Sequence, residues 1–140
     1  MKVYLKQIDN FSLVARAESN HWVSIDEKVD DGGNGAATGP MELMLMSLAG
    51  CSAMDVISIL KKRRVENLQL EIEVEAERRE KYPRKFTNIH LKYIVTGKDI
   101  KEKDVARAIQ LSEEKYCSAI AMVKNTAKMT SEYVVNNLYI

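Results

Sequence analysis

The segment at residues 43–60 restricts the fold of this chain most, because its apolar side chains occupy nearly every direction around a helix axis. Pro40 suits the first position of that helix and Gly39 suits its cap. Glu42 stands three positions after Gly39 and can accept a hydrogen bond from the free N–H group of the cap. A helix that is apolar on all sides belongs in an interior. A chain of 140 residues can hardly cover every face of it, so the sequence predicts a homodimer as the working unit.

Composition and charge exclude several classes of partner. The chain has 21 Lys+Arg against 20 Asp+Glu, a formal net charge of +1, and 46% hydrophobic residues. These values are ordinary for one folded domain spanning residues 1–140, and they give no basic surplus for binding nucleic acid or an anionic membrane. The N-terminus lacks the apolar run of a secretion signal, and we expect no later segment with the length of a membrane span. We therefore expect a cytoplasmic protein, with no cofactor indicated.

Alternating apolar and polar residues predict most of the strands. The chain begins with three segments typical of a β-meander, at residues 2–8, 11–18 and 22–26. The glycine-rich loop at 30–40 lacks the GK[ST] ending of a phosphate loop, so we interpret it as a turn-rich connection. Residues 68–77 alternate apolar side chains with glutamine and glutamate, and residues 86–95 supply the partner strand. On that strand His90 is expected to face the glutamates as a cross-strand charge partner.

The C-terminal half is predicted to be mainly helical before a last strand. A helix opened by Asp99 together with Glu102 is expected through about Lys115, a new helical turn after Cys117, and a strand at 132–139. The order of strands, long helix, two strands, helices and strand indicates an α+β fold rather than a wound parallel sheet.

The chain has two cysteines, and their positions alone leave redox, catalytic and packing roles open. Cys51 lies roughly 16 Å from the start of the apolar helix, beyond the reach of the helix dipole. Burial among its helical neighbours Met44, Leu48 and Met54 would by itself make a thiol inert. Cys117 is expected in the N-terminal turn of a short helix, where free N–H groups favour a thiolate.

Two segments resemble the OsmC/Ohr family, named for osmotically inducible protein C and organic hydroperoxide resistance. GPMELMLMSLAGCSAMDV, with its Gly-Pro start and its apolar helix leading to Cys51, resembles the central helix of the family. CSAIAMV, which begins at Cys117, resembles the second cysteine-led helix. The order of elements agrees over nearly the whole chain. The resemblance implies antiparallel strands around two long central helices, in an intertwined homodimer with active sites at the subunit interface.

Some members of this family are thiol-dependent hydroperoxide reductases, so the resemblance implies the same chemistry here. A thiol of ordinary pKa, near 8.5, is only about 3% ionised at pH 7, so the attacking Cys51 would need a nearby cation. Attack on a peroxide would release an alcohol and leave a sulfenic acid on Cys51, which Cys117 would resolve as an intrachain disulfide. An external dithiol would then reduce that disulfide. Apolar neighbours, Met46 among them, suit an organic hydroperoxide as substrate.

The charge partners of the family's reactive thiol are matched only weakly. In well-characterised peroxidatic members a glutamate follows the helix-starting proline directly, and an arginine in the N-terminal strands orients the thiolate. Here Met41 follows Pro40, and Glu42 falls on the opposite side of the helix from Cys51. Arg16 is the arginine of the N-terminal strands but stands close to the family position rather than at it. Glu42 and Arg16 are candidate charge partners, with a capping acid and a solvated strand arginine as the alternatives, and the chain fits a divergent OsmC-like branch.

Two other interpretations of the cysteines stay open. The first is a non-catalytic dimer of the same fold that binds a small apolar ligand or a partner, which a titration of thiol reactivity against pH would distinguish. The second is a structural disulfide, or a metal site formed with His21 and His90. The two cysteines and two histidines show none of the short paired spacings of zinc modules, so no metal is expected.

Overall fold

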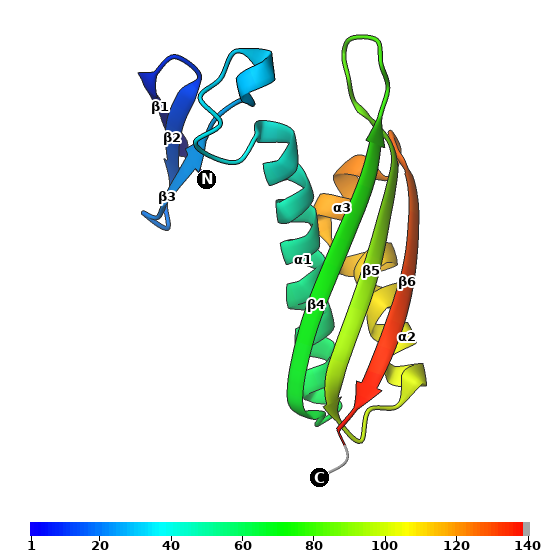
Figure 1. Ribbon diagram of the computed structural model, residues 1–140. Coiled ribbons are helices and arrows are strands. Elements are labelled where there is room, and N and C mark those ends of the chain that lie inside the picture. The colour runs from blue at the N-terminus through cyan, green and yellow to red at the C-terminus, as the bar shows by residue number, and fades with distance from the viewer. Residues whose placement is uncertain (139–140) are drawn as a thin grey trace. The chain divides into compact units, whose positions relative to one another are not determined.

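The computed structural model describes residues 1–138, which fall into two compact units, Met1–Met46 and a second unit that begins at Ser47. The N-terminal unit is an antiparallel meander with the order β1-β2-β3 (Figure 1), formed by β1 (Val3–Asp9), β2 (Ser12–Ala17) and β3 (Trp22–Ile25). Asn10 and Asn20 occupy the two turns with φ of 46° and 62°, which asparagine tolerates. The three predicted strands are confirmed.

Asp26 organises the loop that follows the meander and contains η1 (Val29–Asp31). The Asp26 side chain is buried, and its carboxylate accepts hydrogen bonds from the N–H groups of Glu27 (2.8 Å), Asn34 (3.4 Å) and Ala36 (3.1 Å) and from the Ser12 hydroxyl (2.9 Å). Burial raises the pKa of this carboxyl, but the four hydrogen bonds outweigh burial and hold its pKa below the usual value. A buried acid therefore fixes the glycine-rich connection.

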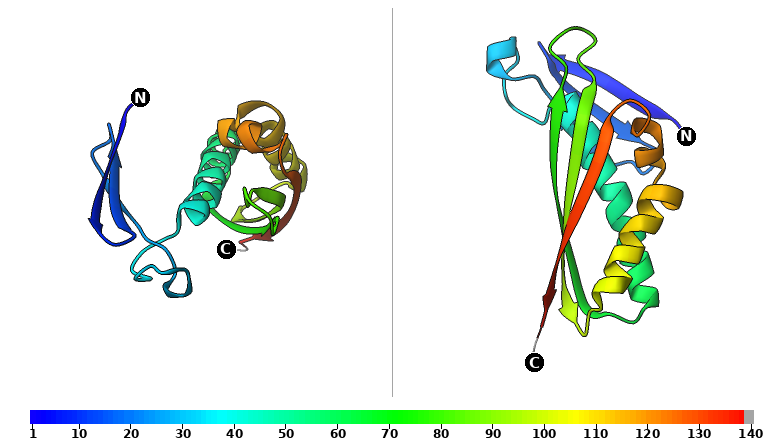
Figure 2. Two further views of the ribbon diagram at one scale, coloured as in Figure 1. Left: turned by 90° about the horizontal axis from the view of Figure 1, so that it is seen from above. Right: turned by 90° about the vertical axis from the view of Figure 1, so that its right-hand side faces the viewer.

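The second unit is one sheet with helices on one face (Figure 2), and helix α1 (Pro40–Lys62) enters it from the first unit. The sheet has the order β4-β5-β6, and its strands are β4 (Glu66–Arg78), β5 (Phe86–Lys98) and β6 (Lys128–Asn137). β5 pairs antiparallel with β4 and parallel with β6. The other helical elements are α2 (Glu102–Leu111), the π-helical segment η2 (Ser112–Tyr116) and α3 (Ser118–Val123). The predicted α+β fold is confirmed.

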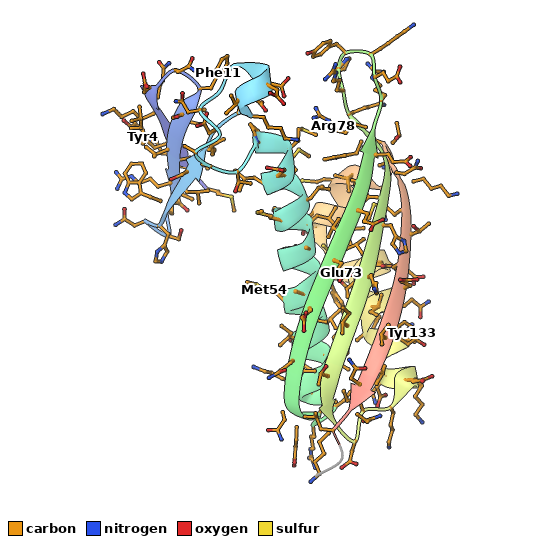
Figure 3. All side chains as sticks on the ribbon, viewed as in Figure 1. Tyr4, Phe11, Met54, Glu73, Arg78 and Tyr133 are labelled. Carbon is orange, nitrogen blue, oxygen red and sulfur yellow. The ribbon has the colours of Figure 1, made fainter. Side chains whose placement is uncertain are left out.

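The β4–β5 hairpin follows its period of two closely. The apolar side chains of β5 that face the helices are buried, namely Phe86, Ile89, Leu91, Tyr93 and Val95. The opposite face carries the glutamates of β4. One of them, Glu73, is labelled in Figure 3 and forms an ion pair with Lys92 at 3.1 Å. His90 lies in register with Glu75 and has its Nε2 3.9 Å from Glu132 and its Nδ1 2.8 Å from the Thr130 hydroxyl. The predicted cross-strand role of His90 is confirmed.

Three predicted boundaries are wrong. The second helix, expected to be opened by Asp99, begins at Glu102 with Lys101 as its N-cap, because Asp99 lies in a bend with φ of 54°. The helix expected to reach residue 115 changes character at Ser112, where the Cys117 N–H donates to the Ser112 carbonyl at 2.8 Å across a π turn. The last strand begins at Lys128 rather than 132, because its polar first residues pair with β5 from Asn88 onward without an apolar alternation to reveal them. It ends at Asn137, and residue 139 of the prediction lies outside the described residues.

Helix α1 buries only one stripe within its own chain. That stripe has a spacing of four residues and consists of Leu48, Ser52, Val56 and Leu60. Met54 is 76% exposed and lies on the side of α1 turned away from the sheet (Figure 3). The expectation that no segment has the length and apolarity of a membrane span is wrong, because an 18-residue window of α1 has a mean hydropathy of 1.9. Only 22% of that window is buried in the chain, so most of this apolar helix is uncovered.

Candidate functional site

The two cysteines meet in the second unit. The Sγ atoms of Cys51 and Cys117 and one carboxylate oxygen of Asp55 all lie within 4.8 Å of one another. Both thiols are free, with Cys51 half-buried and Cys117 only 3% exposed. The chain thus brings together two residues that the sequence singled out, and it adds a carboxylate that the sequence analysis did not assign.

Local helix geometry explains why these three groups meet. Asp55 follows Cys51 by four residues on α1, so the two side chains lie on one face, one turn apart. On the other side of the site, the π turn that begins at Ser112 ends at Cys117, which is the N-cap of α3. The Cys117 sulfur accepts a hydrogen bond from the Ile120 N–H at 3.4 Å. The N-terminal position predicted for Cys117 is confirmed.

Burial outweighs the stabilisation of a Cys117 thiolate that was predicted from its place at a helix N-terminus. Burial and, to a smaller extent, the neighbouring Cys51 raise the pKa of the Cys117 thiol to about 11, although the Ile120 N–H acts in the opposite direction. Cys117 therefore stays protonated at neutral pH. A buried thiol of this kind suits a residue that reacts second, after its more exposed neighbour.

A chain of buried hydroxyl groups ends at Asp55. The Tyr93 hydroxyl lies 2.7 Å from Ser52 Oγ, Ser52 Oγ lies 3.0 Å from Ser112 Oγ, and Ser112 donates to Asp55 Oδ2 at 3.1 Å. The three hydroxyl-bearing residues are fully buried. Polar interruptions of the apolar helix at Ser52 and Asp55 were the available sequence signal, but the partners on β5 and η2 stand too far away in the chain to be recognised.

One titratable group, Tyr93, begins this hydroxyl chain, and a second, Glu113, lies close to Tyr93. Burial raises the pKa of Tyr93 to about 12, an effect that the Ser52 hydrogen bond opposes and the charge of Glu113 reinforces. Glu113 is half-buried, and burial likewise raises the pKa of its carboxyl above the usual value. Tyr93 is therefore a hydrogen-bond donor rather than an anion at neutral pH.

The candidate charge partners Glu42 and Arg16 lie in the N-terminal unit. Glu42 accepts a hydrogen bond from the Gly39 N–H at 2.8 Å, which confirms the capping interaction. The Arg16 guanidinium donates to the Asn20 side chain at 2.6 Å and lies 5.1 Å from the centre of the Trp22 ring. Both residues thus have local structural contacts.

A cleft of about 510 Å³ opens beside Asp55. Its walls combine apolar with charged side chains, from Asp55, Ser58, Ile59, Lys62, Arg63, Leu111 and Tyr116. Lys62 and Arg63 place positive charge near the end of α1, while Tyr116 precedes Cys117 directly. The cleft offers a molecule with both apolar and polar parts a route toward the carboxylate.

Cys51, Asp55 and Cys117 are also the residues that could hold a metal ion. Two thiolates and a carboxylate are ligands that zinc accepts, although structural zinc sites take four protein ligands. His90 belongs to the sheet face described above, and His21 belongs to the N-terminal unit, so neither joins this group.

Comparison with known proteins places the chain in a family. The model of the family described as OsmC-like protein matches residues 32–132, and the chain belongs to this OsmC family. Protein YhfA of Escherichia coli strain K12 is 41% identical over 135 residues, which cover 96% of this chain and 98% of YhfA.

Two solved structures show how widely the fold is shared. A hypothetical protein from Aquifex aeolicus VF5 is 33% identical with a TM-score of 0.81, and the match covers 97% of both chains. The organic hydroperoxide resistance protein OhrB of Bacillus subtilis is 14% identical with a TM-score of 0.62, over 96% of this chain and 98% of OhrB. The likeness to OhrB shows a common fold alone.

Proposed function

We propose that this protein reduces organic hydroperoxides to alcohols, with Cys51 as the peroxidatic and Cys117 as the resolving residue. One observation carries the proposal: two free thiols, 66 residues apart in sequence, lie within 4.8 Å of each other in a member of the OsmC family. The fold is one on which a protein named for organic hydroperoxide resistance is built. The exposed fractions support this order, because the half-buried Cys51 is the more accessible thiol.

The reaction balances as two displacements and a reduction. The Cys51 thiolate attacks one peroxide oxygen, the O–O bond breaks, and the departing alkoxide takes a proton to give the alcohol. The Cys117 sulfur then attacks the sulfenic sulfur of Cys51, forming the disulfide and releasing water. An external dithiol restores both thiols and leaves as its own disulfide. The sulfurs need only a small movement to reach bonding distance, about 2.05 Å.

The working unit in this proposal is a homodimer of the OsmC-like domain at residues 1–140. The uncovered apolar side of α1 supports a dimer, because a second copy would remove that surface from water. Arg16 and Glu42 are proposed as charge partners of the Cys51 thiolate in the assembled protein. A reducing compartment, the cytoplasm, is proposed because the mechanism requires the two thiols to be regenerated.

The test is peroxide consumption with cumene hydroperoxide and a dithiol such as reduced lipoamide. The wild type should turn over, and Cys51→Ser should consume none. Cys117→Ser is the matched control, because it keeps the attacking thiol; it is assayed without the dithiol, which would itself reduce a sulfenic acid. It should then consume about one equivalent and stop, with oxygen retained on Cys51. Unchanged consumption by Cys51→Ser would overturn the proposal.

A further inference from the structure

We propose that the Asp55 carboxylate is the general base of the resolving step. It accepts the proton of the Cys117 thiol as that sulfur attacks oxidised Cys51, and it passes the proton to the departing hydroxide, which leaves as water. The inference rests on the proposed function, since it assigns the proton of one of its steps. The S–S bond forms, the S–O bond breaks, and Asp55 is an unchanged carboxylate at the end.

Position is the first argument. A carboxylate oxygen of Asp55 lies within 4.8 Å of both sulfurs, so it can reach the attacking thiol and the atom that the leaving group departs from. A general base must come within hydrogen-bond distance of its proton, directly or through one water, and the geometry of a resting protein is commonly looser than that. A small rotation of the Cys117 thiol or one bridging water closes the gap.

Need is the second argument. Cys117 is 3% exposed, so solvent has poor access to its proton. Burial also disfavours the charged form of a thiol, so the free Cys117 thiolate is a minor species at neutral pH. Resolution by the free thiolate alone would therefore be slow at neutral pH. A base that removes the proton during the attack avoids this dependence on a rare anion.

The hydroxyl chain is the third argument, because its last member, Ser112, donates a hydrogen bond that fixes the position of the Asp55 carboxylate. Each hydroxyl has one proton, and an ionised carboxylate can only accept. With Asp55 ionised, all three contacts are hydrogen bonds if Tyr93 donates to Ser52, Ser52 donates to Ser112, and Ser112 donates to Asp55. The chain stabilises the carboxylate and fixes its Oδ2, while a carboxylate keeps further lone pairs for a thiol proton.

Other charged and titratable groups around the site bear on its pH dependence. Cys51 lies on the same helix as Asp55, and Lys62 and Arg63 share the cleft with Asp55. Tyr93 of the sheet begins the hydroxyl chain, and Glu113 of η2 lies close to Tyr93. Tyr93 stays protonated up to a pKa of about 12, so it cannot replace Asp55 as the base at neutral pH.

The experiment follows the resolving step without any peroxide. Reduced protein receives one equivalent of Ellman's reagent in the presence of a chelator, so that metal binding at the thiols is excluded. The accessible Cys51 releases the first thionitrobenzoate and becomes a mixed disulfide, and attack by Cys117 releases the second. Cys117→Ser should release the first equivalent only, which identifies the two phases. The rate of the second phase is measured from pH 6 to pH 10.

The wild type should show a second phase nearly independent of pH across neutrality. Asp55→Asn keeps an acceptor for Ser112 and should slow this phase by about 10²- to 10⁴-fold at pH 7, with a rate that rises about tenfold per pH unit. Asp55→Glu should restore a flat profile at a reduced rate. The matched control is Glu114→Gln, which removes an exposed acid of η2 that hydrogen-bonds Gln110, and it should behave as the wild type.

Three results would overturn the inference. They are a wild-type second phase that rises tenfold per pH unit, an Asp55→Asn rate equal to the wild type, and an Asp55→Asn rate that falls while its profile stays flat, which indicates structural damage only. Failure of the proposed function is separate, because it would appear as absent hydroperoxide consumption while the Ellman phases still report on Asp55.

Discussion

Truncation of Met54 should weaken a dimer without weakening the fold of the chain. Met54 is 76% exposed and lies on the uncovered side of α1 (Figure 3), whereas the neighbouring Val56 is fully buried. Burying a methionine side chain contributes about 1.5–3 kcal/mol, so covering the exposed three-quarters contributes about 1–2 kcal/mol per chain. Both copies contribute in a symmetric dimer, giving about 2–4 kcal/mol. Met54→Ala should thus raise the dimer dissociation constant about 30- to 1000-fold.

Sedimentation velocity over a range of micromolar concentrations measures this dissociation constant. Met122→Ala is the control, because it removes an equally exposed methionine, 81%, from α3 rather than α1. Leu60→Ala should behave differently, costing about 2–5 kcal/mol of unfolding free energy through a cavity inside the single chain. A monomeric wild type at micromolar concentration, or an unchanged dissociation constant for Met54→Ala, would refute the assignment of this α1 face to a subunit interface.

Three further predictions concern stability and its pH dependence. Folding raises the pKa of Cys117 to about 11. Its contribution to stability is therefore complete below the unfolded pKa, near 8.5, and is lost as pH rises through about 11. In urea unfolding, the reduced wild type should lose stability over this pH range more steeply than Cys117→Ala. Folding lowers the pKa of Asp26, so its contribution to stability is present above the unfolded pKa, near 3.9, and is lost as pH falls through the folded value. Asp26→Asn should therefore lower stability at neutral pH and make stability less dependent on pH in the acid range. An unchanged dependence on pH in the acid range would contradict this. Ser52→Ala leaves the buried Tyr93 hydroxyl without its 2.7 Å partner and should lower the free energy of unfolding by about 1–3 kcal/mol. This is more than the roughly 1 kcal/mol expected of Tyr93→Phe. The reverse order in urea titrations would argue against the direction assigned to the hydroxyl chain.

The parts of the fold that follow a local period were predictable from sequence. The alternation of β4 with its glutamates gave the hairpin and the role of His90, and Gly39 with Glu42 gave the start of α1. The boundary at Ser112 was not predictable, because the π turn covers the largely polar run Ser112–Tyr116, which has no apolar periodicity to mark the change. The polar start of β6 was missed because a strand at the edge of the sheet needs no apolar face there.

The candidate site likewise contains residues that the sequence predicted and residues that it did not. Cys51 and Cys117 were found through the resemblance of their surrounding segments, whereas their spacing alone gave no reason to pair them. Asp55 was visible only as a polar interruption of an apolar helix, because its partner Ser112 lies 57 residues away in sequence. Burial also reversed the effect predicted for Cys117, since a helix N-terminus favours a thiolate only where burial does not outweigh it.

The most direct test of the redox assignment is the covalent state of the two sulfurs after a single oxidation. Reduced wild-type protein would receive one equivalent of cumene hydroperoxide, be alkylated under denaturing conditions and be analysed by peptide mass spectrometry without reduction. We expect one linked pair of peptides containing Cys51 and Cys117 within a single chain, formed together with one equivalent of cumyl alcohol. Two freely alkylated cysteines with the hydroperoxide intact, or a linkage between Cys51 residues of different chains, would contradict it.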